Sequence, residues 1–432
     1  MTFTSTRNKD LRVSFEETVF RVLAPDGGLY IPAEEADLSS LFGSFPREAS
    51  FLETAVATVS ALLEGELDKE TSERVCRQAF TFEPVISDLG DGISLLELYH
   101  GPSCAFKDYG ASFLASCMEE FLEDEDRRSV ILTATSGDTG SAVAQAFHGR
   151  DRIDVIILYP SGRVSPLQEK QLTTLGGNVT ALEVSGSFDD CQRMVKEAFV
   201  DPALSQAVPL TSANSINLGR LIPQSFYYIW SVTRIGQPAP HICVPSGNFG
   251  NLTAAVMAWK WGLPVSGFTA ATNRNDVVPE YLLSGSYTPR PSVRTYSNAM
   301  DVGDPSNFER LLHLFSGSRD SMSDSIRGVS VTDEQTLEVI RDVRKSKGIF
   351  MDPHTAVGYL AALAFRKQDP ETPVILASTA HPGKFLEIVE KATGERPRLP
   401  ERLSRVLDLP KQSIKVAPET GALKEFLLKK FN

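Results

Sequence analysis

The segment Val130-Ile131-Leu132-Thr133-Ala134-Thr135-Ser136-Gly137-Asp138-Thr139-Gly140 decides the fold class of this 432-residue chain. It begins with a short apolar run rich in β-branched residues, which is typical of a strand buried on both faces of a sheet. A glycine-rich turn follows directly, and the alanine-rich pattern of residues 141–147 predicts a helix after it. A strand, a turn and a helix in this order indicate a βαβ unit, and therefore a parallel sheet.

The same alternation continues along most of the chain. Further apolar runs that predict strands lie at residues 155–159, 179–184, 241–244, 265–272 and 374–377. Helical patterns accompany them at residues 189–199, 216–232, 252–261, 333–347, 355–366 and 385–393. We therefore expect an α/β protein whose parallel sheets are covered by helices.

Two regions depart from this alternation. The first part of the chain contains a strong turn at Ala24-Pro25-Asp26-Gly27-Gly28 and a helical pattern near residues 51–63. Residues 284–330 are rich in Ser, Pro, Gly and Arg, and this composition fits an insertion, a mobile flap or a surface excursion equally well. Because a single core rarely serves so long a chain, we expect two or three domains.

Composition narrows the function. The formal net charge of −12 argues against nonspecific nucleic-acid binding, and no apolar stretch is long enough to predict a membrane span. The six histidines lack metal-ligand spacing, so no metal is expected. The five cysteines form no Cys-x-x-Cys pair and the N-terminus lacks a secretory pattern, which together indicate reduced thiols and a cytoplasmic location.

A second segment, Gly101-Pro102-Ser103-Cys104-Ala105-Phe106-Lys107-Asp108-Tyr109-Gly110, places one lysine at the start of an amphipathic helix. Burial beside Phe106 would lower the pKa of the Lys107 amine and leave it nucleophilic. Taken alone, this window fits a surface lysine at a helix start better, because most lysines are exposed.

Three loops at the predicted strand ends are suited to ligands. A glycine turn before a helix offers free N–H groups to an anion, so loop 245–251 suits a phosphate and loop 133–140, with its hydroxyls, suits a carboxylate. Each loop could equally be a strand-to-helix turn that binds no ligand, and neither has the dinucleotide-binding pattern Gly-x-Gly-x-x-Gly. In the third loop, 377–384, a hydroxyl could bond a ring nitrogen or simply cap the following helix.

Together these segments resemble the threonine synthase family, in its longer bacterial and fungal type, over nearly the whole chain. The matching segments follow in the family order: residues 5–7, 23–30, 101–110, 135–140, 165–171, 214–217, 246–251 and 378–382. Small departures at Ser103, Cys104 and Tyr109 keep size and polarity roughly intact.

The resemblance implies a fold-type-II pyridoxal-phosphate enzyme, similar to the tryptophan synthase β subunit. This architecture has two parallel-sheet αβα domains and here an N-terminal domain. We expect the N-terminal domain at residues 1–96, the large cofactor-binding domain at 97–115 with 210–432, and the small domain at 116–209. Because the longer type is often monomeric, a monomer is expected.

The resemblance also implies how pyridoxal 5'-phosphate is held. Lys107 would form the Schiff base and act as the catalytic base. Thr379, with Ser378 beside it, would face the pyridine nitrogen. Asp138 would lie near the ring oxygen, where two acceptors meet, so one of them must carry a proton. The cofactor phosphate would be held by loop residues Gly247, Asn248, Phe249, Gly250 and Asn251.

The implied reaction converts O-phospho-L-homoserine and water to L-threonine and phosphate. The substrate carboxylate would be bound by Thr135, Ser136, Gly137 and Thr139. Candidates for the substrate phosphate, by neighbourhood and charge, are Arg163, Lys170, Asn217 and Arg220, and each could equally be an ordinary surface residue. Two alternatives stay open: a threonine or serine dehydratase-type eliminase, and a non-catalytic relative that binds a phosphorylated ligand.

Overall fold

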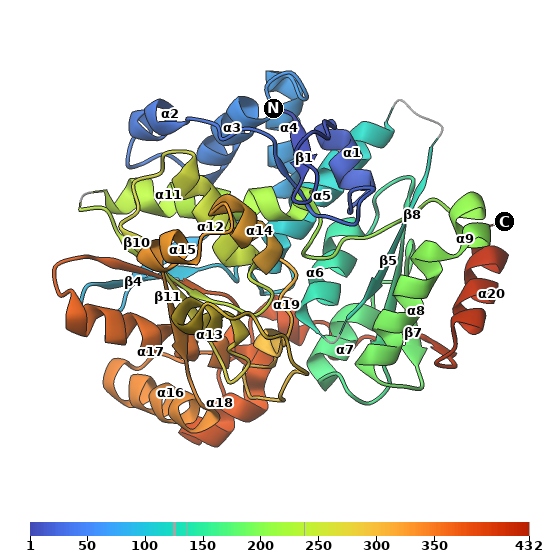
Figure 1. Ribbon diagram of the computed structural model, residues 1–432. Helices are drawn as coiled ribbons and strands as arrows, with labels where there is room; N and C mark the ends of the chain where they lie inside the picture. The colour runs from blue at the N-terminus through green and yellow to red at the C-terminus, as the bar shows by residue number, and fades with distance from the viewer. Residues whose placement is uncertain (124–126, 136, 237, 432) are drawn as a thin grey trace.

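Two sheets organise the chain in the computed structural model, which describes residues 1–123, 127–135, 137–236 and 238–431 (Figure 1). The larger sheet has the strand order β11 (Ile326–Ser330), β10 (Gly267–Thr272), β9 (His241–Pro245), β12 (Val374–Ser378), β4 (Ile93–Glu97) and β3 (Val85–Asp88). The smaller sheet has the order β13 (Ile414–Val416), β7 (Val179–Val184), β6 (Ile153–Pro160), β5 (Ser129–Ala134) and β8 (Leu210–Thr211). All neighbouring strands are parallel except β3 with β4. The predicted α/β class is confirmed.

Every strand expected from an apolar run is present, within two residues at each end. Three of them, β9, β10 and β12, lie side by side in the larger sheet, and β5, β6 and β7 lie side by side in the smaller one. Each of these six strands is buried along its whole length except at one residue at most. This burial explains why the runs are continuous rather than alternating.

Helices cover the sheets on both faces. Those around the larger sheet are α11 (Phe226–Ile235), α12 (Gly250–Lys260), α13 (Val277–Ser284), α16 (Asp333–Lys347), α17 (Pro353–Gln368) and α18 (Leu386–Thr393). Those around the smaller sheet are α6 (Asp138–Phe147), α7 (Pro166–Thr173), α8 (Phe188–Val200), α9 (Pro202–Ala207) and the C-terminal α20 (Thr420–Phe431). A short helix, α19 (Glu401–Ser404), lies in the connection between the two groups. Within the described residues, no helix is long and apolar enough to cross a membrane.

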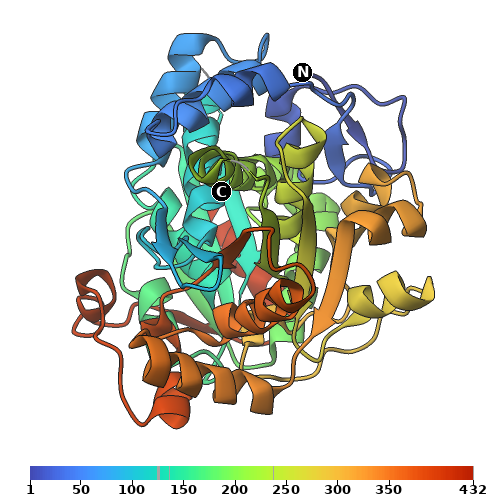
Figure 2. The same ribbon diagram turned by 90° about the vertical axis from the view of Figure 1, so that its left-hand side faces the viewer.

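The first part of the chain forms its own small layer. It contains the antiparallel pair β1 (Phe3–Ser5) and β2 (Tyr30–Pro32) and the helices α1 (Phe15–Phe20), α2 (Ser39–Ser44), α3 (Phe51–Leu62) and α4 (Lys69–Ala79). The helix expected near residues 51–63 is α3, whose start is fixed by a capping box between Ser50 and Glu53. Figure 2 shows these blue helices at one end of the molecule and the orange helices α16 and α17 at the other.

The expected helix at 216–232 is interrupted. The chain forms α10 (Leu218–Leu221), then the 3-10 turn η1 (Ile222–Ser225), and then α11. Pro223 accounts for the interruption, because it has no N–H to continue the helical hydrogen bonds. The segment 284–330 also contains regular structure: η2 (Asn298–Met300), α14 (Phe308–Leu314), α15 (Arg319–Ser325) and β11.

Strand pairing bears on the expected domain boundaries, which stay a prediction. The sequence predicts residues 85–96 to belong to the N-terminal domain, yet β3 and β4 pair within the larger sheet. Residues 414–416 were assigned to the large domain, yet β13 pairs with β7 of the smaller sheet. If the domains are defined by the sheet to which each strand belongs, the large domain begins before β3. The C-terminal strand β13 and helix α20 then belong to the small domain.

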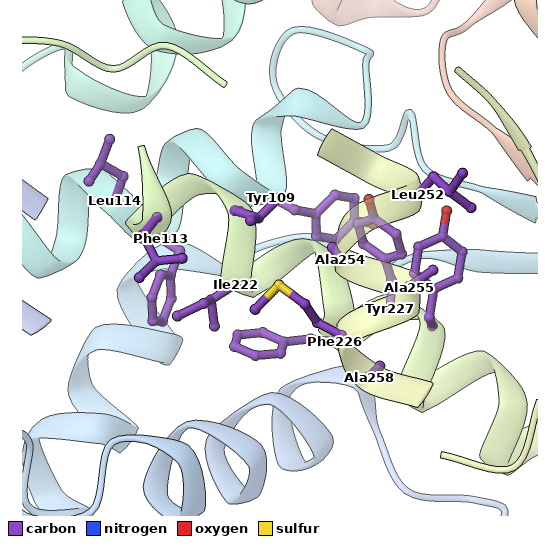
Figure 3. Close-up of a cluster of buried hydrophobic side chains, with 14 of the residues drawn as sticks. Tyr109, Phe113, Leu114, Ile222, Phe226, Tyr227, Leu252, Ala254, Ala255 and Ala258 are labelled. Carbon is purple, nitrogen blue, oxygen red and sulfur yellow. The ribbon is translucent and has the colours of Figure 1, made fainter. Parts of the chain in front are cut away.

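An aromatic core supports the helix that carries Lys107. This helix, α5 (Lys107–Leu122), packs against η1 and α11 and shares a buried cluster with α12, whose side chains are drawn in Figure 3. The Phe113 and Phe226 rings meet edge to face at 5.7 Å, and the Tyr109 and Tyr227 rings at 5.3 Å. Because α5 and α12 share this core, their N-terminal ends are held at fixed positions relative to each other.

Candidate active site

The lysine loop is joined to the loop that follows β12. Phe106 N donates to Thr379 O at 2.8 Å, and His381 N donates to Cys104 O at 3.1 Å. The backbone at Cys104 adopts the left-handed conformation with φ 57°, which turns the chain into the start of α5. Lys107 and the Ser378–Thr379 pair, distant in sequence, are therefore brought together by backbone hydrogen bonds.

Lys107 has the character expected of a nucleophilic amine. Its surroundings lower the pKa to about 8, chiefly because burial disfavours the charged form, while the Asp138 carboxylate partly opposes this. The Nζ atom lies 4.7 Å from the centre of the Phe106 ring and has no hydrogen-bond partner among the described residues. The direction of this shift is the one that the sequence predicts.

The Gly-Pro turn before the lysine makes room for a buried carboxylate. Asp108 Oδ2 accepts a hydrogen bond from Ser103 N at 2.9 Å, and burial raises the pKa of Asp108 to about 6. A Cβ atom at Gly101 would overlap this carboxylate. Glycine is thus required at position 101, and the hydrogen bond from Ser103 N to Asp108 stabilises the conformation of the loop.

The loop after β9 forms an uncapped helix start. Helix α12 has no side-chain cap, and the N–H groups of Gly250, Asn251 and Leu252 have no acceptor among the described residues. A Cβ atom at Gly247 would lie 2.6 Å from Met300 Cα, so only glycine fits this position. Phe249, at φ 61°, completes the turn. Free N–H groups at a helix N-terminus suit a phosphate.

The segment 284–330 forms the outer wall of this loop. Asn248 Oδ1 accepts from Ser306 N at 2.6 Å, and Asn248 Nδ2 donates to Ser215 Oγ at 2.5 Å. Asn307 Nδ2 adds a bond to Asn248 O at 3.1 Å. Asn248 therefore uses its side chain to fasten the loop to its neighbours.

Asn251 has an unused donor at the same loop. Its Oδ1 accepts from the Tyr227 and Tyr228 hydroxyls at 2.6 and 2.7 Å. Its Nδ2 is buried without a hydrogen-bond partner among the described residues. An unpaired buried donor is costly, so an acceptor from a ligand would fit here.

The two hydroxyls after β12 differ in their partners. Ser378 Oγ shares a hydrogen bond with Thr355 Oγ1 at 3.0 Å, and Thr355 Oγ1 in turn donates to Asp352. The Thr379 hydroxyl has no partner among the described residues, although this residue is buried. Thr379 is therefore the hydroxyl that is free to bond a ring nitrogen.

Asp352 links this hydroxyl pair to the wall of the phosphate loop. His354 Nδ1 lies 2.8 Å from Asp352 Oδ1, and His354 Nε2 accepts from Ala299 N at 3.1 Å. Because Nε2 is an acceptor, the imidazole proton resides on Nδ1 and faces the carboxylate. Ala299 and Met300 lie directly against Gly247. One buried network thus connects both ends of the site.

Asp138 has a partner that the sequence prediction missed. Lys384 Nζ lies 2.9 Å from Asp138 Oδ1, and both side chains are buried. Gln168 Nε2 donates to the same oxygen at 3.0 Å. The positive charge of Lys384 holds the pKa of Asp138 well below its usual range despite burial, so Asp138 is ionised. Lys384 is the last residue of loop 377–384, from which the sequence predicts ligand contacts only by hydroxyl groups. No feature of the neighbouring sequence identifies Lys384 as the partner of Asp138.

The loop before α6 is shaped by its own threonine. Thr135 Oγ1 accepts from Gly137 N at 3.1 Å and from Gly140 N at 2.9 Å. The N–H groups of Asp138 and Thr139, at the start of α6, have no acceptor in the part of the chain that the structure describes. Ser136, also expected to bind the substrate carboxylate, lies outside the described residues.

The four candidates for the substrate phosphate lie in different surroundings. Arg163 is exposed, and Lys170 Nζ donates to Leu409 O at 2.5 Å. Asn217 donates to Val19 O at 2.9 Å and to Ser212 O at 3.1 Å, while its Oδ1 caps α10. These bonds use both donors of the Asn217 amide.

Arg220 differs from the other three. It is buried, with Nη1 donating to Ala213 O at 2.5 Å, and its Nε has no partner among the described residues. Its charge contributes to the lowered pKa of Lys107. Of the four, it is the one with a buried, unused donor beside the lysine.

These groups fit a ligand with a carbonyl, a ring nitrogen and a phosphate. The lysine amine, the free Thr379 hydroxyl and the glycine-lined helix start provide one matching partner for each. The unpaired donor of Asn251 adds to the phosphate end. The residues present thus fit pyridoxal phosphate.

Comparisons with known proteins agree with this geometry. The family "Pyridoxal-phosphate dependent enzyme" matches residues 83–379, and the families "Threonine synthase N terminus" and "Threonine synthase, C-terminal" match residues 2–80 and 355–427. The threonine synthase of Haemophilus influenzae is 40% identical over 426 residues, covering 98% of both chains.

Solved structures show the same likeness over the full length. The pyridoxal-phosphate-bound threonine synthase from Brucella melitensis superposes with a TM-score of 0.93 at 33% identity, with both chains fully covered. The threonine synthase from Escherichia coli gives a TM-score of 0.91 at 39% identity, again with full coverage.

Proposed function

The chain belongs to the threonine synthase family, and we propose that its site converts O-phospho-L-homoserine and water to L-threonine and phosphate. As a member of this family, it is a pyridoxal-phosphate-dependent enzyme of threonine biosynthesis. One observation carries the substrate proposal: the uncapped starts of α6 and α12 and the buried Arg220 offer three places for anions in a negatively charged chain. The cofactor phosphate, the substrate carboxylate and the substrate phosphate would fill them.

Lys107 is proposed as the residue that binds the cofactor covalently and afterwards moves protons. An amine with a pKa near 8 is partly neutral at physiological pH, so it can attack a carbonyl and accept a proton from the substrate Cα. The cofactor, when bound, supplies the electron sink for the resulting carbanion. Once the substrate has displaced it, Lys107 is free to carry this proton and to return it at the end.

The geometry of the site supports a set of residues for the phosphate and the pyridine nitrogen of the cofactor. Gly247, Phe249, Gly250 and Asn251 would hold the phosphate, with Asn248 fastening the loop. Thr379 would bond the pyridine nitrogen, with Ser378 behind it. A hydroxyl does not favour a protonated ring nitrogen as a carboxylate would, which moderates the electron sink and suits elimination and replacement.

At the substrate end, the start of α6 is proposed for the carboxylate and Arg220 for the phosphate. The free N–H groups of Asp138 and Thr139 and the glycine at 137 support the first assignment, and Thr135 keeps this loop in shape. The buried, unused donor of Arg220 supports the second. Arg163 and Lys170 are weaker candidates, because one is exposed and the other is engaged by Leu409 O.

Product analysis tests the proposal against its alternatives. The purified protein with pyridoxal phosphate should release phosphate from O-phospho-L-homoserine and form an equal amount of threonine. A dehydratase-type eliminase would instead form a keto acid from threonine itself. A non-catalytic relative would bind the phosphorylated ligand without turnover. Keto acid without threonine, or binding without phosphate release, would each overturn the proposal.

We further propose that the protein acts as a cytoplasmic monomer, as the longer type of the family suggests. Its five cysteines, all buried and unpaired, suit a reducing compartment. Light scattering coupled to size exclusion should give a mass near the 47.3 kDa of the chain. A mass of twice this value would contradict the monomer.

A further inference from the structure

Lys384 is a buried cation in the middle of the site that the proposed mechanism does not use. It lies in the 3-10 turn η3 (Pro382–Phe385), which follows the Ser378–Thr379 pair. Its side chain has 0% exposure. Its Nζ contacts Asp138 Oδ1 at 2.9 Å and Ser103 O at 2.6 Å. These partners place it between the lysine loop and the start of α6.

The contacts of Lys384 join the two sheet layers. Asp138 begins α6 beside the smaller sheet, whereas Lys384 follows β12 of the larger sheet. Two glutamines of α7 strengthen the junction: Gln168 Nε2 bonds Asp138 Oδ1 at 3.0 Å, and Gln171 Nε2 bonds Ser103 O at 3.1 Å. Lys384 and its neighbours therefore connect the layers at the point where the cofactor residues meet.

The hydrogen-bond inventory leaves one donor unused. An ammonium group has three N–H donors, and the described residues accept from two of them. Because this side chain has no exposed area, neither water nor an atom of a ligand can reach the remaining donor directly. Asp138 Oδ2 likewise has no partner among the described residues. The Asp138 side chain is 4% exposed, so its second oxygen is the group of this pair that a ligand atom can reach.

The Lys384–Asp138 pair decides which of the two acceptors at the cofactor ring oxygen carries a proton. That oxygen and the Asp138 carboxylate are both acceptors, and one proton is missing between them. The Lys384 ammonium keeps Asp138 ionised, so the ring oxygen is the group that must carry the proton.

We propose that Lys384 is a positioning residue, which holds Asp138 as a carboxylate beside the cofactor ring oxygen and, through these two charges, sets the protonation of the cofactor-bound Lys107. The inference rests on the proposed assignment of Lys107 and Asp138 to the cofactor. The charges already act on Lys107: the Asp138 carboxylate raises its pKa, and the Lys384 ammonium lowers it. Removing Lys384 should therefore favour the protonated form of the linkage at Lys107.

The test compares three variants by a pH titration of the visible absorption of the cofactor-loaded protein. Lys384→Met should move the titration midpoint upward by roughly one pH unit and weaken cofactor binding about tenfold. Asp138→Asn combined with Lys384→Met should recover part of the affinity, because a buried charge without its partner costs more than the loss of both. Lys384→Gln offers a second variant if Lys384→Met fails to fold.

The matched control is Lys424→Met, which removes the same side chain from a surface pair with Asp201 at 2.7 Å. It should change neither the midpoint nor the cofactor affinity. A Lys384→Met midpoint equal to that of the wild type would overturn the proposal, as would a double variant that binds the cofactor no better than Lys384→Met alone. No substrate is used, so these outcomes are separate from failure of the phosphohomoserine assay.

Discussion

The cofactor end and the substrate-phosphate end of the site differ in how far the expected residues come together. At the cofactor end, Lys107 and Thr379 lie on loops joined by hydrogen bonds, and the loop at Gly247 packs against Met300. Each of the three has a free group for the ligand. At the other end, Lys170 and Asn217 bond the protein's own backbone. A glycine-rich motif indicates the backbone conformation of its loop. A charged or polar residue chosen only because it lies near a motif in the sequence gives no information on where its side chain points.

Lys107→Ala should give the largest difference in effect between a substitution at the cofactor end and one at the substrate-phosphate end. The variant should lose the cofactor's visible absorption band and at least about 10³-fold in activity, because it lacks both the covalent link and the base. Absorption spectra and phosphate release measure the two effects. Lys170→Ala is the matched control and should keep the band. An unchanged band in Lys107→Ala would break the assignment of the cofactor end.

Gly247→Ala should show that the phosphate loop needs its close backbone approach. The new methyl group would meet Met300 Cα at 2.6 Å, so the loop must shift, and we expect cofactor affinity to fall about tenfold or more. Fluorescence titration of the unloaded protein with pyridoxal phosphate measures this loss. Gly43→Ala, which meets no atom within 4 Å, serves as the control. Equal affinities for both variants would contradict the prediction.

The pH dependence of cofactor uptake probes the lowered pKa of Lys107. Burial lowers this pKa from 10.5 to about 8, so the neutral, reactive amine accumulates as the pH rises through 8. The rate of cofactor uptake by the unloaded protein should therefore rise with pH and level off above about pH 8 to 9. Stopped-flow absorption measures it. A rate still rising steeply at pH 10 would indicate an unperturbed lysine.

Asn217→Ala should affect folding rather than the cofactor. It removes two donated bonds from a buried amide and the cap of α10, which is expected to cost about 1–3 kcal/mol in the free energy of unfolding. Urea unfolding measures this cost, while the absorption band should stay unchanged. A stable variant with a raised KM would instead return Asn217 to the substrate end.

Arg163→Ala should have the smallest effect. The side chain is exposed and has no partner among the described residues, so activity and stability should stay within about twofold and 0.5 kcal/mol of the wild type. Phosphate release at low and high substrate concentration checks this. A large rise in KM for Arg163→Ala alone would mean that the substrate phosphate binds nearer the surface than Arg220.

Elements with a local signal could be predicted from the sequence. The six buried strands can be recognised in the sequence as continuous apolar runs. The glycine-rich loops can then be located, because they begin where these runs end. Strand β11, Ile-Arg-Gly-Val-Ser, gives no such run, because it lies at a sheet edge and is only partly buried. Strand β13 has three residues, too few to show any periodicity.

Contacts between distant segments could not be predicted. The Asp138–Lys384 pair and the network from Asp352 to Ala299 join residues whose local sequence carries no mark of the partner. Their positions follow from how the two sheets and the 284–330 segment pack, which is a property of the whole fold. The substrate-phosphate ligands belong to the same class, so they need a structure with the ligand bound.

The most direct test of the cofactor end is to trap the covalent link with borohydride and map it by peptide mass spectrometry. After reduction of the cofactor-loaded wild type, the peptide that contains Lys107 should carry the mass of the reduced phosphopyridoxyl group. Lys384, the second lysine of the site, should stay unmodified. A label on Lys384, or no labelled peptide in a coloured protein, would contradict the account.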